Sequence, residues 1–267
     1  KYFRRWLGAD EFLNGYESWC LWLGDCPPSE LRAMPQAMKR VQAVKAFRLA
    51  SKSAPTQKLA DTPTRFHVEF MPKRIYMVIP EVSSQRRDYI PMGYLPPSTL
   101  ASNKLRILPN ASLNDFGILM SRMHMAWTNY TCGRLKSDYQ YSIHIVYNNF
   151  PWPGFESKEA ATLMDRAQAA INTAAQAVLD ARAESQGATL ADLYDPLAMP
   201  AALVKAHQKL DKAVDAAYGY KGPPDDAARV AFLFTLYQQL TGATALAAPV
   251  PAAKPPKPRK PRAMVHF

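Results

Sequence analysis

A row of polar side chains lies in the stretch Cys132–Pro153, and its residue types suit hydrogen bonds to nucleic-acid bases. The members are spaced by two along the chain: Arg134, Lys136, Asp138 and Gln140. In an extended chain all four side chains would leave the same face. Lys and Arg donate to guanine O6 and N7, Asp accepts from cytosine N4, and Gln suits adenine, so Lys136 and Asp138 could read the two halves of one G·C pair. A solvated edge strand whose mixed charges prevent aggregation has the same composition, and both interpretations stay open on residue types alone.

A second polar segment is expected to hold phosphates. Ser83, Ser84, Arg86 and Arg87 lie between two apolar runs. Arginine presents a fork of donors to anions, so these residues and Arg134 are candidate contacts to a nucleic-acid backbone. A plain charged turn is the alternative. A further loop contributes Ser102, Asn103 and Lys104.

The elements that must position these residues follow from hydrophobic periodicity. Alternation predicts a half-buried strand where Ile143, Ile145 and Tyr147 face one side. Further strands and helices are expected from apolar runs and from apolar positions spaced by three and four. The expected strands are 74–80, 88–95 and 105–108, and the expected helices are 29–51, 114–127, 157–182, 201–217 and one that begins after Asp225 and ends at Gly242.

This order of elements predicts an α+β fold with three parts. Residues 1–153 form a mixed α/β domain, residues 154–243 form a small all-α helical bundle, and residues 244–267 are a disordered basic tail rich in Pro, Ala and Lys. The boundary at 153 rests on the Pro-Trp-Pro-Gly run at 151–154. His124 falls inside a predicted helix without a partner at ligand spacing, so we expect a packed residue with no catalytic role.

The cations are unevenly distributed along the 267 residues, whose net charge is +11. The first 150 residues carry 20 Lys and Arg against 11 Asp and Glu, and residues 151–248 carry 8 against 11. The last 19 residues carry 5 cations and no acid. A basic first half followed by a mildly acidic part predicts a polyanion-binding module with a structural companion.

Compartment signals favour the cytoplasm. No apolar run approaches the ~18 residues of a membrane span, and no membrane contact is expected. The chain begins at Lys1 without an initiator Met, which suggests a fragment of a longer protein. The number of cysteines, three, is odd, and no two of them form a C-x-x-C motif. We therefore expect a reducing environment, no disulfide and no metal site.

Motifs for catalysis or for binding a nucleotide cofactor are missing or broken. The 267 residues contain neither a glycine-rich phosphate loop nor a G-x-S-x-G elbow. Glu156 and Lys158 match only the E-x-K half of a metal-dependent nuclease site, and Asn149-Phe150-Pro151-Trp152 lacks the second proline of an adenine methyltransferase motif. The chain is therefore expected to bind DNA without catalytic residues. A free-standing DNA-binding regulator and a Glu156-dependent nuclease remain alternatives.

Several long motifs, in the right order, resemble those of MmeI-like proteins. The target-recognition domain of that family is matched by Phe3–Leu23, Ile79–Gly93, His124–Trp127 and Gly133–Pro153. The helical C-terminal domain of the same proteins is matched by Leu190–Pro196, Met199-Pro200 and Ala206–Asp211. The family comprises single-chain adenine-N6 DNA methyltransferases, many of them fused to a nuclease as type II restriction-modification enzymes.

The resemblance implies a double-stranded DNA recognition module whose catalytic half is elsewhere. The missing methyltransferase domain of the same polypeptide would bind S-adenosylmethionine, and this fragment would hold no cofactor. The base-reading positions of the family fall on Lys136, Asp138 and Gln140. The loop Ser102, Asn103 and Lys104 matches another variable contact region, so these three residues are also expected to read bases.

Overall fold

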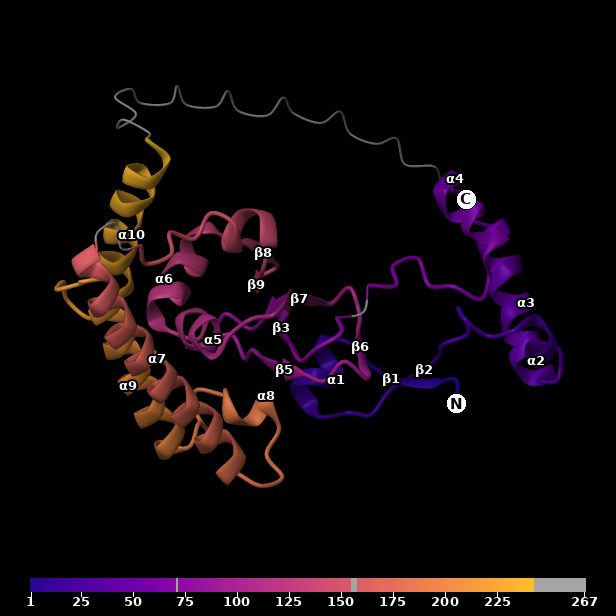
Figure 1. Ribbon diagram of the computed structural model, residues 1–267, viewed down its shortest axis with the longest axis horizontal. Helices are drawn as coiled ribbons and strands as arrows, with labels where there is room; N and C mark the ends of the chain where they lie inside the picture. Colours follow the sequence, from indigo (N-terminus) through magenta and orange to yellow (C-terminus); the bar gives the residue numbers. More distant parts are fainter. Residues whose placement is uncertain (71, 155–157, 243–267) are drawn as a thin grey trace, which may run out of the picture.

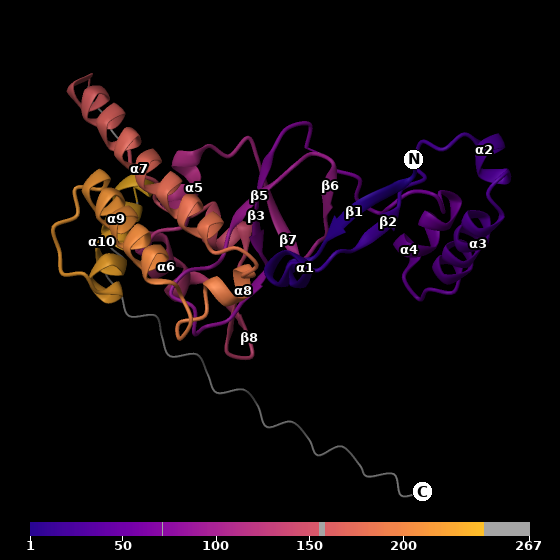
Figure 2. The same cartoon turned by 90° about the horizontal axis from the view of Figure 1, so that it is seen from below.

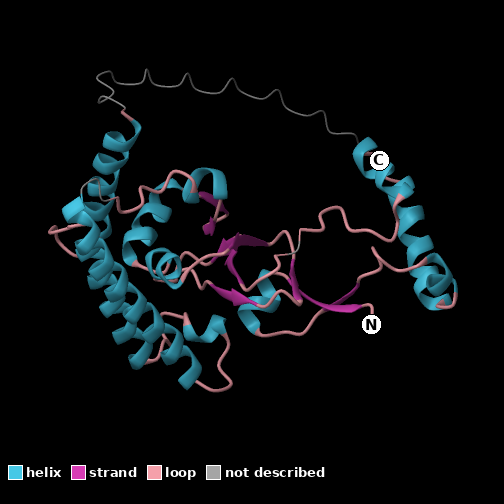
Figure 3. Cartoon of the chain, in the orientation of Figure 1, coloured by secondary structure: helices cyan, strands magenta, loops and turns pink. Residues whose placement is uncertain are grey.

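The computed structural model of the protein describes residues 1–70, 72–154 and 158–242. A helical arm lies at one end, three small sheets lie in the middle, and long helices lie at the other end (Figure 1). The predicted α+β class, mixed first and helical afterwards, is confirmed (Figure 3). The predicted tail and Glu156 lie outside the described residues. No helix among the described residues is long and apolar enough to cross a membrane.

Three sheets of three strands each form the centre. The first has the order β2-β1-β6, the second β5-β3-β7 and the third β4-β9-β8. Among the described strands only the pair β1–β6 is parallel. The strands are β1 (Phe3–Leu7), β2 (Trp19–Leu21), β3 (Tyr76–Pro80), β4 (Val82–Ser83), β5 (Gly93–Leu95), β6 (Thr99–Ala101), β7 (Leu105–Pro109), β8 (Gly133–Leu135) and β9 (Asp138–Gln140). A single residue, Glu81, separates β3 from β4 and so links the second sheet to the third.

The arm comprises residues 28–61. The sequence predicts one helix over 29–51 in this segment. The arm contains α2 (Pro28–Arg32), α3 (Pro35–Leu49), α4 (Ala54–Lys58) and a short 3₁₀ turn, Leu59–Asp61. Pro35 divides the predicted helix because proline lacks the backbone N–H that a continuing helix needs, and it starts a new helix at the first position. The arm packs on a small core of Leu23, Leu31 and Val41.

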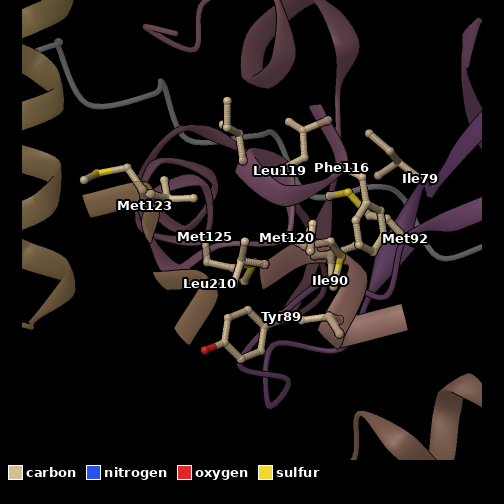
Figure 4. Packing of buried hydrophobic residues seen from close by; sticks show 14 of the residues in the cluster. Ile79, Tyr89, Ile90, Met92, Phe116, Leu119, Met120, Met123, Met125 and Leu210 are labelled. Carbon is tan, nitrogen blue, oxygen red and sulfur yellow. The ribbon is translucent and has the colours of Figure 1, made fainter. Parts of the chain in front are cut away.

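A larger core joins the central sheets to the helices (Figure 4). The central helices are α1 (Ala9–Asn14), α5 (Leu113–Leu119) and α6 (Arg122–Thr131). The single helix expected over 114–127 is divided because the Ser121 side chain accepts a hydrogen bond from the N–H of His124 and caps a new helix there. Met120 and Phe116 of this segment are fully buried beside Met92.

The C-terminal part is helical as predicted. Its helices are α7 (Lys158–Glu184), α8 (Leu190–Leu193), α9 (Ala201–Ala217) and α10 (Asp226–Thr241). Asp225 caps α10 by accepting from the N–H of Ala228, and Gly242 ends it in the left-handed conformation. Helices α7 and α9 pack against each other and α7 packs on α5, whereas α10 packs against α6. The helical part therefore shares its core with the mixed part (Figure 2).

Two predicted strands differ from the structure. Residues Ile143–Tyr147 form a π-helical turn, because the Ser142 hydroxyl accepts from the N–H of Ile145 and the Trp127 indole donates to the carbonyl of Val146. The local cap and the bond from Trp127 thus override the alternating pattern. Of the strand expected over 88–95, only β5 forms; Asp88 is exposed, and residues 89–92 are buried without regular structure.

Candidate nucleic-acid interface

Glu81 joins the three polar segments that the sequence predicts to contact nucleic acid. Its carbonyl accepts a hydrogen bond from the N–H of Tyr141 (2.7 Å), and its own N–H donates to the carbonyl of Lys104 (2.9 Å). Its carboxylate pairs with Lys104 Nζ at 3.1 Å and with Arg106 Nη2 at 2.6 Å. The segments around β4, β7 and β9 therefore meet at one residue. No role was predicted for Glu81, and the sequence shows only a single acid five residues before the arginine pair.

The arginine turn, residues 84–87, follows β4 directly. The N–H of Arg87 donates to the carbonyl of Ser84 (3.2 Å), and the N–H of Arg86 donates to the Ser84 hydroxyl (3.3 Å). Arg86 is exposed and Arg87 is half-buried. Burial lowers the pKa of Arg87, whereas nearby Asp195 and Asp138 act in the opposite direction. Arginine stays charged at neutral pH, so the turn presents two cations.

The predicted row of four polar residues is a hairpin, and this part of the prediction is wrong. The hairpin comprises β8, Lys136, Ser137 and β9 and is called the recognition hairpin here after the base contacts predicted for it. Arg134 lies opposite Tyr139 and Leu135 lies opposite Asp138. Directly paired residues share a face of an antiparallel sheet, so Arg134 faces away from Asp138. Asp138 and Gln140 still share one face.

Lys136 lies at the tip of the hairpin in the left-handed conformation, with φ at 57°. Glycine or asparagine is usual at such a position, because a Cβ atom costs about 1 kcal/mol there. The lysine side chain is exposed. Backbone strain of this kind concentrates at functional sites.

Arg134 orders the hairpin through three neighbours. Its guanidinium lies 4.3 Å from the centre of the Tyr139 ring. It also donates to the carbonyl and side-chain oxygens of Asn129 (3.1 and 2.9 Å) and to the carbonyl of Ser137 (3.3 Å). These contacts make Arg134 a support for the hairpin, and its predicted phosphate contact stays a prediction.

The hairpin and the arginine turn form one surface. Strand β9 pairs with β4, with Ser83 opposite Tyr139, and Asp138 Oδ1 accepts from the N–H of Gln85 (3.3 Å). Within the described residues, no ion pair involves Lys136, Asp138 or the two arginines of the turn. Donors and one acceptor are therefore free for a ligand.

Two of the predicted contact residues are buried. Ser83 is 1% exposed and Ser102 is 7% exposed. The Ser102 hydroxyl accepts from the N–H of Lys104 (3.1 Å), and the backbone N–H of Ser102 donates to the carbonyl of Leu7 (2.8 Å). These placements give both serines a structural position instead of the predicted contact. Asn103 and Lys104 of the same loop are exposed.

A buried polar network from the C-terminal helices supports the arginine turn. Tyr89, two residues after the turn, donates from its hydroxyl to Asp211 Oδ2 of α9 (2.7 Å). The N–H of Arg122 donates to Asp211 Oδ1 (2.7 Å), and the Arg122 guanidinium pairs with Asp226 (2.8 Å) and Asp88 (3.1 Å). Burial raises the pKa of Asp211 to about 6, although the hydrogen bonds from Arg122 and Tyr89 favour the charged form. The network fixes the chain on the C-terminal side of the turn.

His124 is buried and hydrogen-bonded, with its Nδ1 at 3.0 Å from the carbonyl of Leu119 and its Nε2 at 3.1 Å from the Tyr141 hydroxyl. Burial lowers its pKa to about 3, so the ring is neutral at physiological pH. Among the residues that the structure describes, no group of three His, Cys, Asp or Glu side chains is arranged to hold a metal ion.

Comparison with known proteins gives consistent matches over most of the chain. Residues 1–154 match the model "MmeI, target recognition domain", and residues 163–245 match "MmeI, C-terminal domain". The chain is 40% identical over 240 residues to DNA methyltransferase A of Bacillus subtilis (strain 168), covering 90% of this chain and 26% of that protein.

A solved structure agrees in fold and in sequence. The Type IIL restriction-modification enzyme MmeI in complex with DNA superposes with a TM-score of 0.85 at 45% identity, over 90% of this chain and 31% of that one. The chain thus spans between a quarter and a third of the length of these relatives. Because the recognition-domain model covers more than half of its residues, the chain belongs to the MmeI target-recognition-domain family, followed by the C-terminal domain of the same proteins.

Proposed function

We propose that this chain recognises a short sequence in double-stranded DNA on behalf of a DNA methyltransferase of which it is a part. The supporting observation is the surface on which the recognition hairpin and the arginine turn converge beside Glu81. The MmeI structure that this chain resembles was solved with DNA. A cationic surface with free hydrogen-bonding groups at a hairpin tip suits the major groove, which admits a two-stranded β-ribbon.

The residues divide into those that read bases and those that hold the backbone. Lys136 would donate to guanine, Asp138 would accept from cytosine N4, and Gln140 would contact a neighbouring base. Arg86 and Arg87 would hold phosphates. Phosphate contacts set register and affinity, whereas base contacts set the sequence.

Asn103 and Lys104 lie on the neighbouring loop and extend this surface. Lys104 pairs with Glu81 but keeps 63% of its side chain exposed. One ammonium group has three donors, so the ion pair leaves donors for a base or a phosphate.

We assign residues 1–153 to the recognition domain and 154–243 to a helical domain that braces it. Methyl transfer, and the S-adenosylmethionine it needs, would belong to another domain of the parent protein. The methyltransferase name of the Bacillus subtilis relative supports this assignment. We expect the parent protein to act in the cytoplasm, where its DNA substrate lies.

Selection of bound duplexes from a random pool tests the proposal. The unmodified chain should enrich one motif. Asp138→Ala should relax one position of that motif, because a good base contact discriminates by about 1–3 kcal/mol. Arg86→Ala should weaken binding to all duplexes alike and keep the motif. Lys205 is an exposed cation on α9, so Lys205→Ala is the matched control and should change neither the affinity nor the motif. Enrichment of unrelated sequences by the unmodified chain would contradict the proposal.

A further inference from the structure

Helix α3 of the arm is long but little buried. Only Val41 of its 15 residues is buried. Within the described residues its main contacts are with α2, α4 and the following 3₁₀ turn, all of them parts of the arm. Most helices in proteins gain their stability from packing an apolar face. One face of α3, with Ala37, Met38 and Val41, packs within the arm, and the opposite face is open to a ligand.

The charged groups exposed on α3 are all positive. Lys39, Arg40 and Lys45 are exposed, and the helix contains no acidic residue. In the part of the chain that the structure describes, none of these three cations forms an ion pair. Cations that share one helix without counter-charges repel one another, and a polyanion relieves this repulsion.

The remaining cation of the helix has a different role. Arg48 donates to the carbonyls of Leu59 (2.8 Å), Thr62 (2.9 Å) and Arg65 (2.7 Å). It closes the arm on itself and holds the segment after α4 against α3. The arm is thus internally fixed, and the three free cations are presented on an ordered element.

The arm and the recognition hairpin lie on the same side of the molecule. In Figure 1, β8 and β9 stand above the central strands β1, β5 and β6, and α4 with the adjoining end of α3 stands above them as well, at the far end of the molecule. Figure 2 shows the arm beyond the β1–β2 ribbon, well separated along the molecule from β8. A duplex that lies along this side would pass the α4 end of α3, to which Lys45 is the nearest of the three cations.

We propose that helix α3 is a second DNA-binding surface, which holds phosphates of the same duplex at a distance from the base pairs that the hairpin reads. This proposal rests on the proposed function. It assigns Lys39, Arg40 and Lys45 to backbone contact, without a role in sequence choice. The exposed Val44 and Phe47 beside them would suit a protein domain, but the absence of any acid on α3 favours a polyanion.

The test compares two triple variants of the whole chain that lose the same charge. One carries Lys39→Gln, Arg40→Gln and Lys45→Gln on α3, and the control carries Lys205→Gln, Lys209→Gln and Lys212→Gln on α9. All six residues are exposed, and glutamine keeps a good helix propensity, so both variants should fold. Circular dichroism melts check this, and fluorescence anisotropy measures affinity for a selected duplex and a scrambled duplex across a salt series.

The α3 variant is expected to bind both duplexes roughly tenfold or more weakly, with the selected motif unchanged. The slope of log K against log salt should fall by about 0.9 for each lost phosphate contact, hence by about 2 to 3. The α9 control should stay within about threefold of the unmodified chain, because its charges reach DNA only through screened long-range attraction. Equal effects of the two triple variants would overturn the proposal and favour a protein partner for α3.

Failure of the recognition function would look different. If the unmodified chain binds without selecting a motif, while the α3 variant still loses affinity and salt slope, then sequence recognition fails and the second surface stands. If the unmodified chain has no measurable affinity for either duplex, both proposals are overturned.

Discussion

Replacing Tyr89 by phenylalanine removes a single hydroxyl from the contact between the arginine turn and helix α9. That hydroxyl donates to Asp211 Oδ2 at 2.7 Å, and the carboxylate is 9% exposed. A hydrogen bond to a charged group contributes about 1.5–3 kcal/mol, and a buried acceptor left without its donor loses this in full. We therefore expect Tyr89→Phe to lower the free energy of unfolding by about 2 kcal/mol at pH 7.5.

The effect should depend on pH. The pKa of Asp211 is raised from 3.8 to about 6, so its protonated form stabilises the folded state at low pH, and that stabilisation is lost as the pH rises from about 4 to 6. The difference between these pKa values corresponds to about 3 kcal/mol. At pH 5 most Asp211 is protonated in the folded state and needs the tyrosine donor less, so the loss caused by Tyr89→Phe should shrink to about 1 kcal/mol or below.

Urea unfolding at pH 7.5 and pH 5 measures both values. Tyr220→Phe is the matched control, because its hydroxyl donates to the neutral carbonyl of Pro223 at an exposed site, and it should cost less than about 1 kcal/mol at either pH. A Tyr89→Phe protein within about 0.5 kcal/mol of the unmodified chain at pH 7.5, or one with an equal loss at both pH values, would refute the reasoning. If the network positions the turn, the variant should also bind DNA more weakly at pH 7.5, without a change of motif.

Three further variants test the packing, the titration and the hairpin. A Cβ atom on Gly117 would lie 2.6 Å from Ile171 Cγ2, so Gly117→Ala should destabilise the α5–α7 contact by about 1–3 kcal/mol in urea unfolding, whereas Gly154→Ala, which meets nothing within 4 Å, should cost little. Burial lowers the pKa of His124 to about 3, so the neutral ring stabilises the folded state fully above pH 6.5, and this stabilisation is lost as the pH falls below that value. His124→Gln should therefore reduce the slope of the free energy of unfolding against pH, between pH 6.5 and 4, by about 1.4 kcal/mol per pH unit. An unchanged slope would contradict this. Arg134→Lys keeps the charge but loses the planar stack on Tyr139 and the fork of donors, so we expect DNA affinity to fall by roughly fivefold in anisotropy assays, with unchanged affinity as the contrary result.

Elements fixed by strong local signals could be predicted from the sequence. Helix α9 has the predicted limits, and α10 begins after Asp225 because an aspartate that accepts from the N–H three residues later is a local capping signal. Apolar runs also predicted β3 and β7 to within two residues. In each case the chain within a few residues determines the element.

The hairpin and the π-helical turn could not be predicted because their signals are weak or lie elsewhere in the chain. The hairpin turns at Lys136 without the glycine or asparagine that marks such a turn, so the polar row resembled one strand. The turn at Ile143–Tyr147 depends on Trp127, which is distant in sequence. The support of the arginine turn by Asp211 spans 122 residues from Tyr89, and no local pattern encodes it.

The most direct test of base recognition is the double variant Lys136→Glu, Asp138→Arg, which exchanges donor and acceptor at the hairpin. Lys136→Asn is its control, because asparagine tolerates the left-handed conformation while it removes the cation. Selection of duplexes from a random pool, with the unmodified chain alongside, should show one position of the motif change from G·C to C·G in the double variant, and only a relaxed preference there in the control. Selection of the same motif by the unmodified chain and by the double variant would contradict the claim that Lys136 and Asp138 read the DNA.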